Sequence, residues 1–329
     1  MRLLSLISNI FWFPFSLQKP YPYQLQTQQF NNKNYIMYKN NENQSIIHSN
    51  ICPHQGGIFS TSGFISKRGN VVCGYHGFEY KNGSFVGICH QPCKTKEKKK
   101  HVPTLFSKQT NDMIFVSNES NPRFSEIFFP PEEYNSSFRA VTGHIRLRNN
   151  YLTVTENLLD MLHISYVHSF GSRFSLPQNL TFVPLSPIHG RSSFYYQPNK
   201  KSLSTLLEKK YKKEKASVVH VENEFCLPTN TVTRVKVQDK DVKTIFTRSI
   251  PINENETILY WKLYRNFWIG NTIMNCIGDF FVRKLMNQVV QEDVNILQGI
   301  DVKNKDGPVK TKYDKTILMY RKFIKDFME

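Results

Sequence analysis

Two short segments of the chain each combine one cysteine with one histidine beside glycines. Cys52 and His54 lie in CPHQGG, and Cys73 and His76 lie in CGYHGF. Sulfur and imidazole ligands in one cluster suit zinc or an iron–sulfur centre. A finger-type zinc site places two cysteines before two histidines, whereas each segment here offers one of each. This order favours a two-iron cluster in which one iron takes both cysteines and the other takes both histidines.

A second group of candidate ligands lies in residues 156–171, ENLLDMLHISYVHSFG. Asn157, Asp160 and His163 recur every three residues, so a helix would place them roughly along one face. His168 lies five residues after His163, about 140° further around an ideal helix. The helix must therefore loosen or end between the two histidines if both are to reach one ion. Taken alone, two histidines at this spacing are more often structural.

The paired Cys–His segments resemble the Rieske motif of ring-hydroxylating oxygenases. The resemblance implies that Cys52 and Cys73 bind one iron of a [2Fe–2S] cluster. It implies that His54 and His76 bind the other iron. Phe78 is a departure, because the oxygenases mostly carry tryptophan there, and we expect this change to affect packing and not ligation. Respiratory Rieske proteins add a cysteine to each loop, and neither loop has one here.

The resemblance extends to the second group, because Asn-x-x-Asp-x-x-His-x4-His is the pattern of the mononuclear iron site in the same oxygenases. It implies that His163 and His168 bind a non-haem Fe(II) together with a distant carboxylate. For Asp160 it implies hydrogen bonds to a ligand histidine and to a cluster histidine of the neighbouring subunit, which gives electrons a short path across a trimer interface. Asn157 is expected near the iron without binding it tightly.

The best candidate for the carboxylate is Asp293 in VVQEDVNILQGI, residues 289–300. Asp293 follows Val289 by four residues and precedes Ile296 by three, which predicts a position on the apolar, core-facing side of a helix. A buried carboxylate without a partner is costly, so a bound metal would explain it. Its context, Asp-x-x-Ile-Leu, also resembles the third-ligand segment of the family. The structural alternative is that Asp293 is exposed on a two-faced helix.

The weaker candidates for a metal ligand are Glu292, Asp279, Asp301, Cys89 and Cys93. Glu292 would point about 100° away from Asp293 on the same helix. Cys226 and Cys276 lie in apolar strand and helix contexts, so we expect both in the core.

The charge balance of the chain is strongly basic, with 43 Lys and Arg against 26 Asp and Glu in 329 residues. Two lysine-dense runs, residues 94–101 and 208–215, carry much of this excess. Neither run interleaves aromatic residues at the spacing of a base-stacking platform, which argues against nucleic-acid binding and favours solvated loops and helix faces. Six cysteines in a chain of this length do not form a dense disulfide scaffold, which predicts a reducing, cytoplasmic compartment.

The chain begins with an apolar run, MRLLSLISNIFWFPFSL, that polar residues and Pro14 interrupt. The run is too short and too broken for a transmembrane helix, and it lacks a small-residue cleavage site. We interpret residues 11–15 as the entry into the first domain, and association with a membrane surface is the alternative.

The elements that must hold the candidate ligands fall into two expected domains, 12–130 and 135–329. In the first, NYIMY and SIIH around an Asn-rich turn predict one hairpin, and Lys81-Asn82-Gly83 predicts the turn of another. In the second we expect strands over 143–148, 217–225, 230–238, 243–250 and 257–267, and helices over 156–168, 202–215, 273–300 and 315–328.

These patterns predict an α+β chain, in which a small antiparallel β Rieske domain precedes a catalytic domain. By the resemblance, the latter is of the helix-grip type, with an antiparallel sheet around a long helix. The implied protein is an oxygenase that takes single electrons from a ferredoxin or flavin reductase and uses O₂ at Fe(II) to hydroxylate, demethylate or ring-open an organic, aromatic or polycyclic substrate. The alternatives are a Rieske electron carrier with a non-catalytic second domain and a zinc-stabilised interaction module.

Overall fold

A computed structural model describes residues 8–89, 91–92, 101–199, 218–237, 240–302, 305 and 307–327. The lysine-dense runs except His101, the helix predicted over 202–215 and Cys93 lie outside these ranges. The chain forms two compact units, Met1–Ile127 with Pro251–Glu254 and Phe128–Ile250 with Asn255–Glu329.

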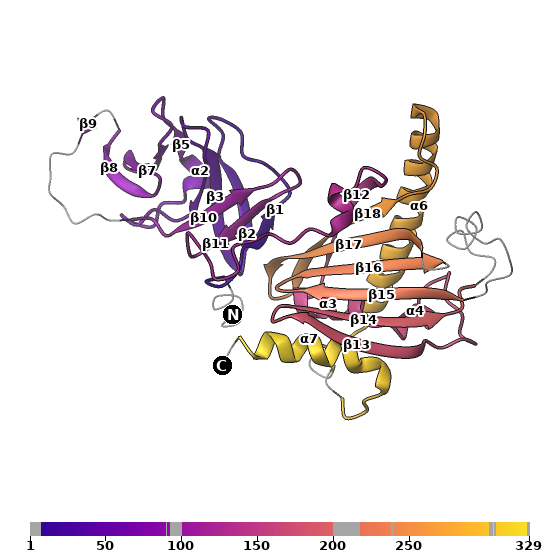
Figure 1. Ribbon diagram of the computed structural model, residues 1–329. Helices are drawn as coiled ribbons and strands as arrows, with labels where there is room; N and C mark the ends of the chain where they lie inside the picture. Colours follow the sequence, from indigo (N-terminus) through magenta and orange to yellow (C-terminus); the bar gives the residue numbers. More distant parts are fainter. Residues whose placement is uncertain are drawn as a thin grey trace. The chain divides into compact units, whose positions relative to one another are not determined.

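The first unit is built from two antiparallel sheets (Figure 1). The six-stranded sheet has the order β1-β11-β10-β4-β3-β2 and the five-stranded sheet has the order β5-β6-β7-β8-β9. Both predicted hairpins are present, as β3–β4 and β7–β8. The elements are β1 (Phe13–Ser16), β2 (Gln26–Phe30), β3 (Lys33–Lys39), β4 (Ser45–Ser49), α2 (Phe59–Ser62), β5 (Phe64–Ile65), β6 (Val71–Val72), β7 (Phe78–Lys81), β8 (Ser84–Ile88), β9 (Gln91–Pro92), β10 (Thr104–Gln109) and β11 (Ile114–Ser117).

The second unit is a seven-stranded antiparallel sheet with helices packed against it, in the order β12-β18-β17-β16-β15-β14-β13. Its strands are β12 (Arg139–Leu147), β13 (Gln178–Ser186), β14 (His189–Tyr196), β15 (Val219–Cys226), β16 (Asn230–Val237), β17 (Lys240–Asn253) and β18 (Glu256–Arg265). Its helices are η1 (Pro131–Tyr134), α3 (Tyr151–Leu159), α4 (His163–Tyr166), α6 (Thr272–Leu297), η3 (Lys312–Asp314) and α7 (Lys315–Lys325).

One face of this sheet packs on α6, which crosses behind the strands in Figure 1. The alternation of strand residues places Val221, Val235 and Leu263 on this inner face, and α6 contributes Val282 and Met286 to the same core. The long helix and the sheet therefore enclose one continuous apolar layer, as the helix-grip resemblance implies.

Two predictions for the helices of this unit were wrong. The helix expected over 156–168 begins at Tyr151, where the Asn150 side chain accepts a hydrogen bond from the Thr153 N–H at 2.8 Å. It ends at Leu159, since Asp160 takes an extended conformation. The short helix α4 then begins at His163 and ends at Tyr166, so the chain breaks at Asp160 and again between the two histidines, as their spacing requires.

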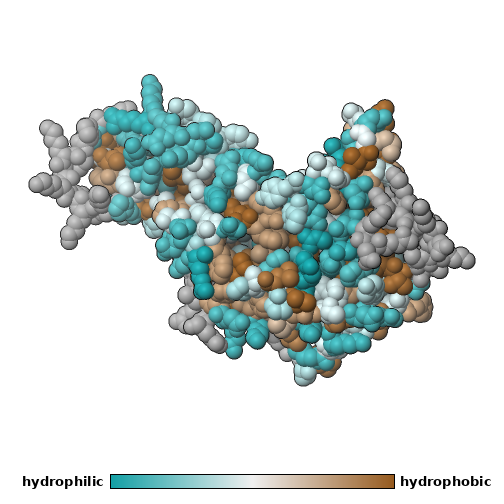
Figure 2. Space-filling model, in the orientation of Figure 1, coloured by the Kyte–Doolittle hydropathy of each residue, from teal (hydrophilic) through white to brown (hydrophobic). Residues whose placement is uncertain are grey.

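The second error concerns which residues of α6 face the core. Ile273, Ile277 and Phe280 recur at helical spacing within the helix predicted over 273–300, yet they are 70%, 43% and 64% exposed. Figure 2 shows apolar residues on the surface at this end of α6. The described residues contain no helix with the length and apolar character that a membrane span requires.

Candidate active site

The two Cys–His segments form loops with matching main-chain hydrogen bonds. The Cys52 N–H donates to the Gly57 carbonyl at 2.8 Å, and the Gly56 N–H donates to the Cys52 carbonyl at 3.0 Å. In the second loop Cys73 and Gly77 make the corresponding bonds, to Phe78 and Cys73, at 2.9 Å each. Gly56 and Gly77 both have positive φ, +73° and +68°, which a side chain disfavours. The same local geometry therefore presents one cysteine and one histidine from each loop.

Burial separates the four candidate ligands into two pairs. Cys52 and Cys73 are each 2% exposed and carry free thiols. His54 and His76 lie on the exposed side of the loops with their ring centroids 4.8 Å apart. A cluster whose inner iron takes sulfur and whose outer iron takes nitrogen fits this arrangement. Burial and the adjacent Cys52 raise the pKa of the Cys73 thiol, and hydrogen bonds from the loop oppose this rise only in part. The thiol is therefore favoured without a metal, and bound iron would shift it to the thiolate.

Close packing against the sulfurs adds to this fit. A Cβ atom at Gly57 would lie 2.9 Å from the Cys73 sulfur, so only glycine leaves room there. Tyr80, on β7, places its hydroxyl 3.2 Å from the Cys52 sulfur. Burial raises the pKa of Tyr80, which keeps this hydroxyl protonated and able to donate. Sequence reasoning missed Tyr80, which lies only four residues after His76.

Tyr80→Phe should lower the reduction potential of the cluster by tens of millivolts. A hydrogen bond to a cluster sulfur stabilises the reduced, more negative state, and the variant removes it. The measurement is a redox titration followed by EPR. Tyr38→Phe is the control, because it removes a buried hydroxyl of the same core that has no hydrogen-bond partner among the described residues. Equal potentials in the Tyr80 variant and the wild type would contradict this role.

The second group of candidate ligands meets in the second unit. His163 is the first residue of α4, His168 follows that helix, and Asp293 projects from α6. The Nε2 atoms of the two histidines are 3.1 Å apart, and each lies 3.5 Å from Oδ1 of Asp293. His168 and Asp293 are 8% and 4% exposed. Two histidines that are close in the sequence and an acid far along the chain therefore converge on one buried point.

These separations fit a metal ion. Ligands about 2.1 Å from a metal and at right angles to one another are separated by about 3 Å. Among the described residues, this is the set of histidine, cysteine and acidic side chains whose ligand atoms cluster within 4.8 Å. Two imidazole lone pairs and a carboxylate that face one another repel unless a positive charge lies between them. Two histidines and one carboxylate suit non-haem iron and leave further coordination positions open.

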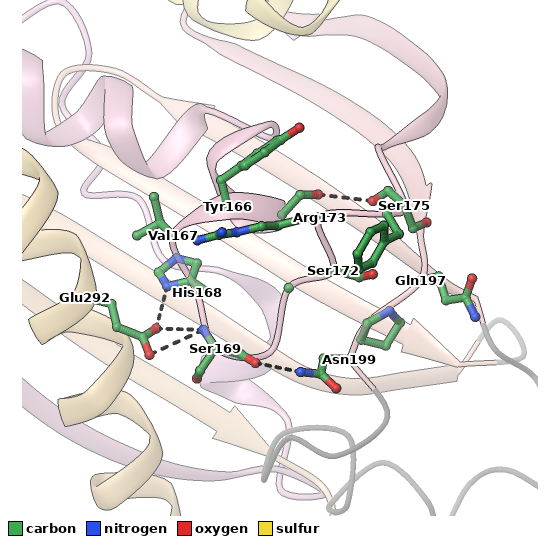
Figure 3. Close-up of a pocket in the computed structure, with 14 residues that line it drawn as sticks. Tyr166, Val167, His168, Ser169, Ser172, Arg173, Ser175, Gln197, Asn199 and Glu292 are labelled. Atoms are coloured by element: carbon green, nitrogen blue, oxygen red, sulfur yellow. Dashed lines mark hydrogen bonds and ion pairs between the residues drawn. The ribbon is translucent and has the colours of Figure 1, made fainter.

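The other ring nitrogens of both histidines are held by hydrogen bonds. His163 Nδ1 lies 2.6 Å from the Asp160 carbonyl, and His168 Nδ1 lies 3.0 Å from Oε2 of Glu292. Glu292 also accepts a hydrogen bond from the Ser169 N–H (Figure 3). A further hydrogen bond to Glu292 comes from the Gln288 amide. Both Nδ1 atoms thus act as donors, which directs the Nε2 lone pairs to the shared point.

The pKa values of the three side chains reflect the same convergence. Burial raises the pKa of Asp293, but His163, His168 and the Asn157 amide outweigh it, and the net pKa is lowered. Burial lowers the pKa of His163, yet the contact with Asp293 leaves it raised. At His168 burial dominates and the pKa is lowered. The lowered pKa keeps Asp293 ionised, so its carboxylate offers a negative charge to a cation between the two histidines.

The structure places the remaining candidates around this centre or away from it. Asn157 donates to Oδ1 of Asp293 at 3.0 Å and so orients the carboxylate. The Asp160 carboxylate accepts from the Leu162 N–H at 2.8 Å, whereas the main-chain carbonyl of Asp160 makes the contact with the His163 ring. Glu292, the alternative ligand, contacts His168 instead.

Three weaker expectations are corrected here. Asp279 is paired with Arg265 at 2.8 Å and with Arg139 at 2.7 Å, away from the histidines. Asp301 is exposed after α6. Cys276, predicted in the core, is exposed, whereas Cys226 is buried as expected.

Two apolar cavities lie between the sheet and α6 beside the three ligands. One, of about 90 Å³, is lined by His163, His168 and Asp293 together with apolar residues. The other, of about 70 Å³, extends along the inner face of the sheet. They share the lining residues Ile164, Phe170, Thr233, Ile245, Met286 and Val289. Apolar cavities beside converging polar groups are the usual form of a small-molecule site.

Comparison with known proteins identifies two families along the chain. The Rieske [2Fe-2S] domain matches residues 12–105, and the vanillate O-demethylase oxygenase C-terminal domain matches residues 147–329. A curated relative is the protochlorophyllide-dependent translocon component 52 of the Arabidopsis thaliana chloroplast, 25% identical over 162 residues. The matched part is 46% of this chain and 29% of that relative.

Several solved structures share the fold over nearly the whole chain. NdmA of Pseudomonas putida CBB5, solved with caffeine, has a TM-score of 0.74 at 16% identity and covers 99% of this chain and 92% of its own. Dicamba monooxygenase has a TM-score of 0.74 at 15% identity, with 98% and 97% coverage. An oxygenase–ferredoxin complex of carbazole 1,9a-dioxygenase has a TM-score of 0.67 at 16% identity, with 97% and 90% coverage. At these identities the likeness shows the fold alone.

Proposed function

Because this chain belongs to the Rieske-type non-haem iron oxygenases with a vanillate O-demethylase-type C-terminal domain, we propose that it uses O₂ and single electrons to hydroxylate, demethylate or ring-open an organic substrate. Its cofactors are a Rieske [2Fe–2S] cluster and a mononuclear iron. We assign the cluster to Cys52, His54, Cys73 and His76, and the iron to His163, His168 and Asp293.

The observation that carries this proposal is the convergence of two Nε2 atoms and one carboxylate oxygen within 3.1–3.5 Å at a buried point lining an apolar cavity. An electron carrier needs no such site in its second domain. Iron held by these three side chains would supply O₂ chemistry next to the cavity. The triad therefore supports the oxygenase over the electron carrier.

The residues of the chain prepare this centre for chemistry in three ways. Asn157 and Glu292 fix the orientation of Asp293 and His168. Phe170 stacks on the His168 ring, with centroids 4.8 Å apart, and shields it on the cavity side. Leu259, Trp261 and Val290 give the same cavity apolar walls, which would exclude water from a bound substrate.

We assign the electron path to Asp160 in a homotrimer, where it would connect the iron site to the cluster of a neighbouring subunit. The half-buried Asp160 contacts the His163 ring through its carbonyl, which supports a role beside the iron. The donor is a ferredoxin or flavin reductase, for which the net charge of +17 offers attraction to an acidic partner. We infer a reducing, cytoplasmic location, because six cysteines in 329 residues are too few for a dense disulfide scaffold.

The test of the function is iron and sulfide analysis with EPR on anaerobically purified, dithionite-reduced protein, followed by O₂ consumption with candidate substrates. We expect about three irons and two sulfides per chain and a Rieske signal. Two irons that added Fe(II) does not raise to three would favour the electron carrier. Zinc without an EPR signal would favour the interaction module.

Glu292→Ala should weaken Fe(II) binding about 10- to 100-fold, the usual cost of removing a carboxylate that orients a metal-bound histidine. Glu292→Gln keeps a hydrogen-bond acceptor for His168, so its Fe(II) affinity should lie between those of Glu292→Ala and the wild type. The measurement is Fe(II) titration of the apoprotein under anaerobic conditions. The control is Gln291→Ala, an exposed neighbour on the same helix, which should bind Fe(II) normally. Unchanged affinity in Glu292→Ala would remove this role.

A further inference from the structure

A buried carboxylate on α3 takes no part in the centre described above. Glu156 is 8% exposed, and glutamate is seldom buried unless it is paired. Arg321 on α7 donates from Nε to Oε1 at 2.7 Å and from Nη2 to Oε2 at 2.8 Å. Lys305, in the segment after α6, donates to Oε2 at 3.0 Å. Two cations from the C-terminal part of the chain therefore converge on one carboxylate of α3.

The geometry of these contacts restricts the position of α3. An arginine that donates to both oxygens of a carboxylate fixes its orientation as well as its distance. Lys305 also donates to Oγ1 of Thr153 at 3.3 Å. Thr153 and Glu156 are three residues apart and so lie on the same face of the helix. The C-terminal part of the chain thus contacts α3 at two neighbouring points.

The end of α3 also provides two hydrogen bonds to the iron site. Asn157 donates to Oδ1 of Asp293 at 3.0 Å. The carbonyl of Asp160, directly after α3, lies 2.6 Å from Nδ1 of His163. The Asp160 N–H donates to the Glu156 carbonyl at 3.0 Å, which joins this residue to the last turn of the helix. A shift of α3 would therefore displace groups that orient two of the three candidate ligands.

The contribution of such an ion-pair cluster to stability is a weak reason for its presence. The desolvation of buried charges offsets most of their attraction, and apolar side chains of similar size often stabilise a fold as well or better. A metal site, in contrast, requires its ligands to be held within about 0.5 Å of the productive geometry. A carboxylate with directional contacts to two cations suits this second requirement.

We propose that Glu156 is a positioning residue for the iron centre. Its contacts with Arg321 and Lys305 hold α3 at the place from which the end of the helix orients the ligands. Glu156 itself touches neither the metal nor the substrate. The geometry of the centre therefore depends on α7, although no residue of α7 belongs to the triad. This inference rests on the proposed function, since it takes the triad as the iron site.

The experiment is an anaerobic Fe(II) titration of the full, cluster-containing chain from which the mononuclear iron has been removed. Glu156→Gln keeps the size of the side chain and removes its charge. It should weaken Fe(II) binding about two- to thirtyfold, the range for a residue that acts on a site through intermediate contacts. Arg321→Met should cause a similar loss, and Arg321→Lys should restore part of the affinity. The double variant should lose little more than the weaker-binding single variant, because both changes remove one contact.

A control variant separates positioning from a general loss of stability. Arg191→Met removes another arginine–glutamate contact of the same unit, with Glu224 at 2.7 Å. It should leave Fe(II) affinity unchanged. The EPR spectrum of the nitric oxide complex of the iron reports the ligand arrangement, so it should change in Glu156→Gln and not in Arg191→Met. The proposal is overturned if Glu156→Gln lowers the unfolding temperature but alters neither the affinity nor the spectrum. If that variant does not fold, Arg321→Met and Arg321→Lys still decide.

The wild-type titration distinguishes this inference from the proposed function. A wild-type chain that holds its cluster but binds no Fe(II) at the triad would overturn both. A wild-type chain that binds Fe(II) no more tightly than Glu156→Gln, with the same spectrum, would overturn the positioning role alone.

Discussion

Asp293→Asn should remove the mononuclear iron and leave the cluster in place. The amide is nearly the same size and can still accept a hydrogen bond from Asn157, so we expect the fold to persist. It lacks the negative charge that balances a metal between two histidines. Iron should fall from about three to about two per chain with the Rieske signal unchanged, and turnover should fall on the order of 10³-fold or more.

A binding measurement checks this prediction without any substrate. Fe(II) at a hundred times its dissociation constant stabilises a protein by about 2.7 kcal/mol, so it should raise the unfolding temperature of the iron-depleted wild type. Asp293→Asn should show no such rise. Asp301→Asn, which changes an exposed acid after the same helix, should behave as the wild type. The assignment fails if the Asp293→Asn protein keeps a third iron, or if the Asp301→Asn protein loses it.

The sequence was most informative where the geometry is local. Cys52 and Cys73 each close a loop through hydrogen bonds that reach no further than five residues along the chain. Such loops depend on a short motif, so their residues could be read without knowing the rest of the fold. The hairpin strands β3 and β4 were predictable for the same reason, since alternating apolar residues around an Asn-rich turn specify both strands.

The iron triad was only partly predictable. Helical periodicity placed Asp293 on the core side of α6, and the structure buries it there. The end of a helix between His163 and His168 was predicted from their spacing and is present at Tyr166. The earlier break at Asp160 was not predicted, because its cause is not in the spacing of the histidines. The Asp160 carboxylate accepts from the Leu162 N–H and thereby begins a new, short helix after the first has ended.

Long-range packing determines the features of the second unit that the sequence did not predict. The exposed apolar residues of α6, such as Ile273 and Phe280, have helical spacing like those of the core, so periodicity alone could not choose between the two faces. Strand β13 gave no alternating signal, because most of its residues are exposed and Pro184 interrupts it.

Cys73→Ala should remove the two irons of the cluster and leave the mononuclear iron in place. Without one of its two sulfur ligands the cluster should not assemble, so two irons, two sulfides and the Rieske signal disappear together. The triad belongs to the second unit, so about one iron per chain should remain. Turnover with a reductase should fall to background, since the iron no longer receives electrons. The matched control is Cys89→Ala in the same unit, which should keep the cluster.

Together, Asp293→Asn and Cys73→Ala distinguish an oxygenase from an electron carrier. An oxygenase would lose turnover in both variants, because each centre is necessary and neither substitutes for the other. About two irons per chain should remain in Asp293→Asn and about one in Cys73→Ala. An electron carrier with an inert second domain would tolerate Asp293→Asn in both iron content and electron transfer. Loss of the cluster in Cys89→Ala, or its survival in Cys73→Ala, would require a different ligand set and would shift the cluster away from the two matched loops.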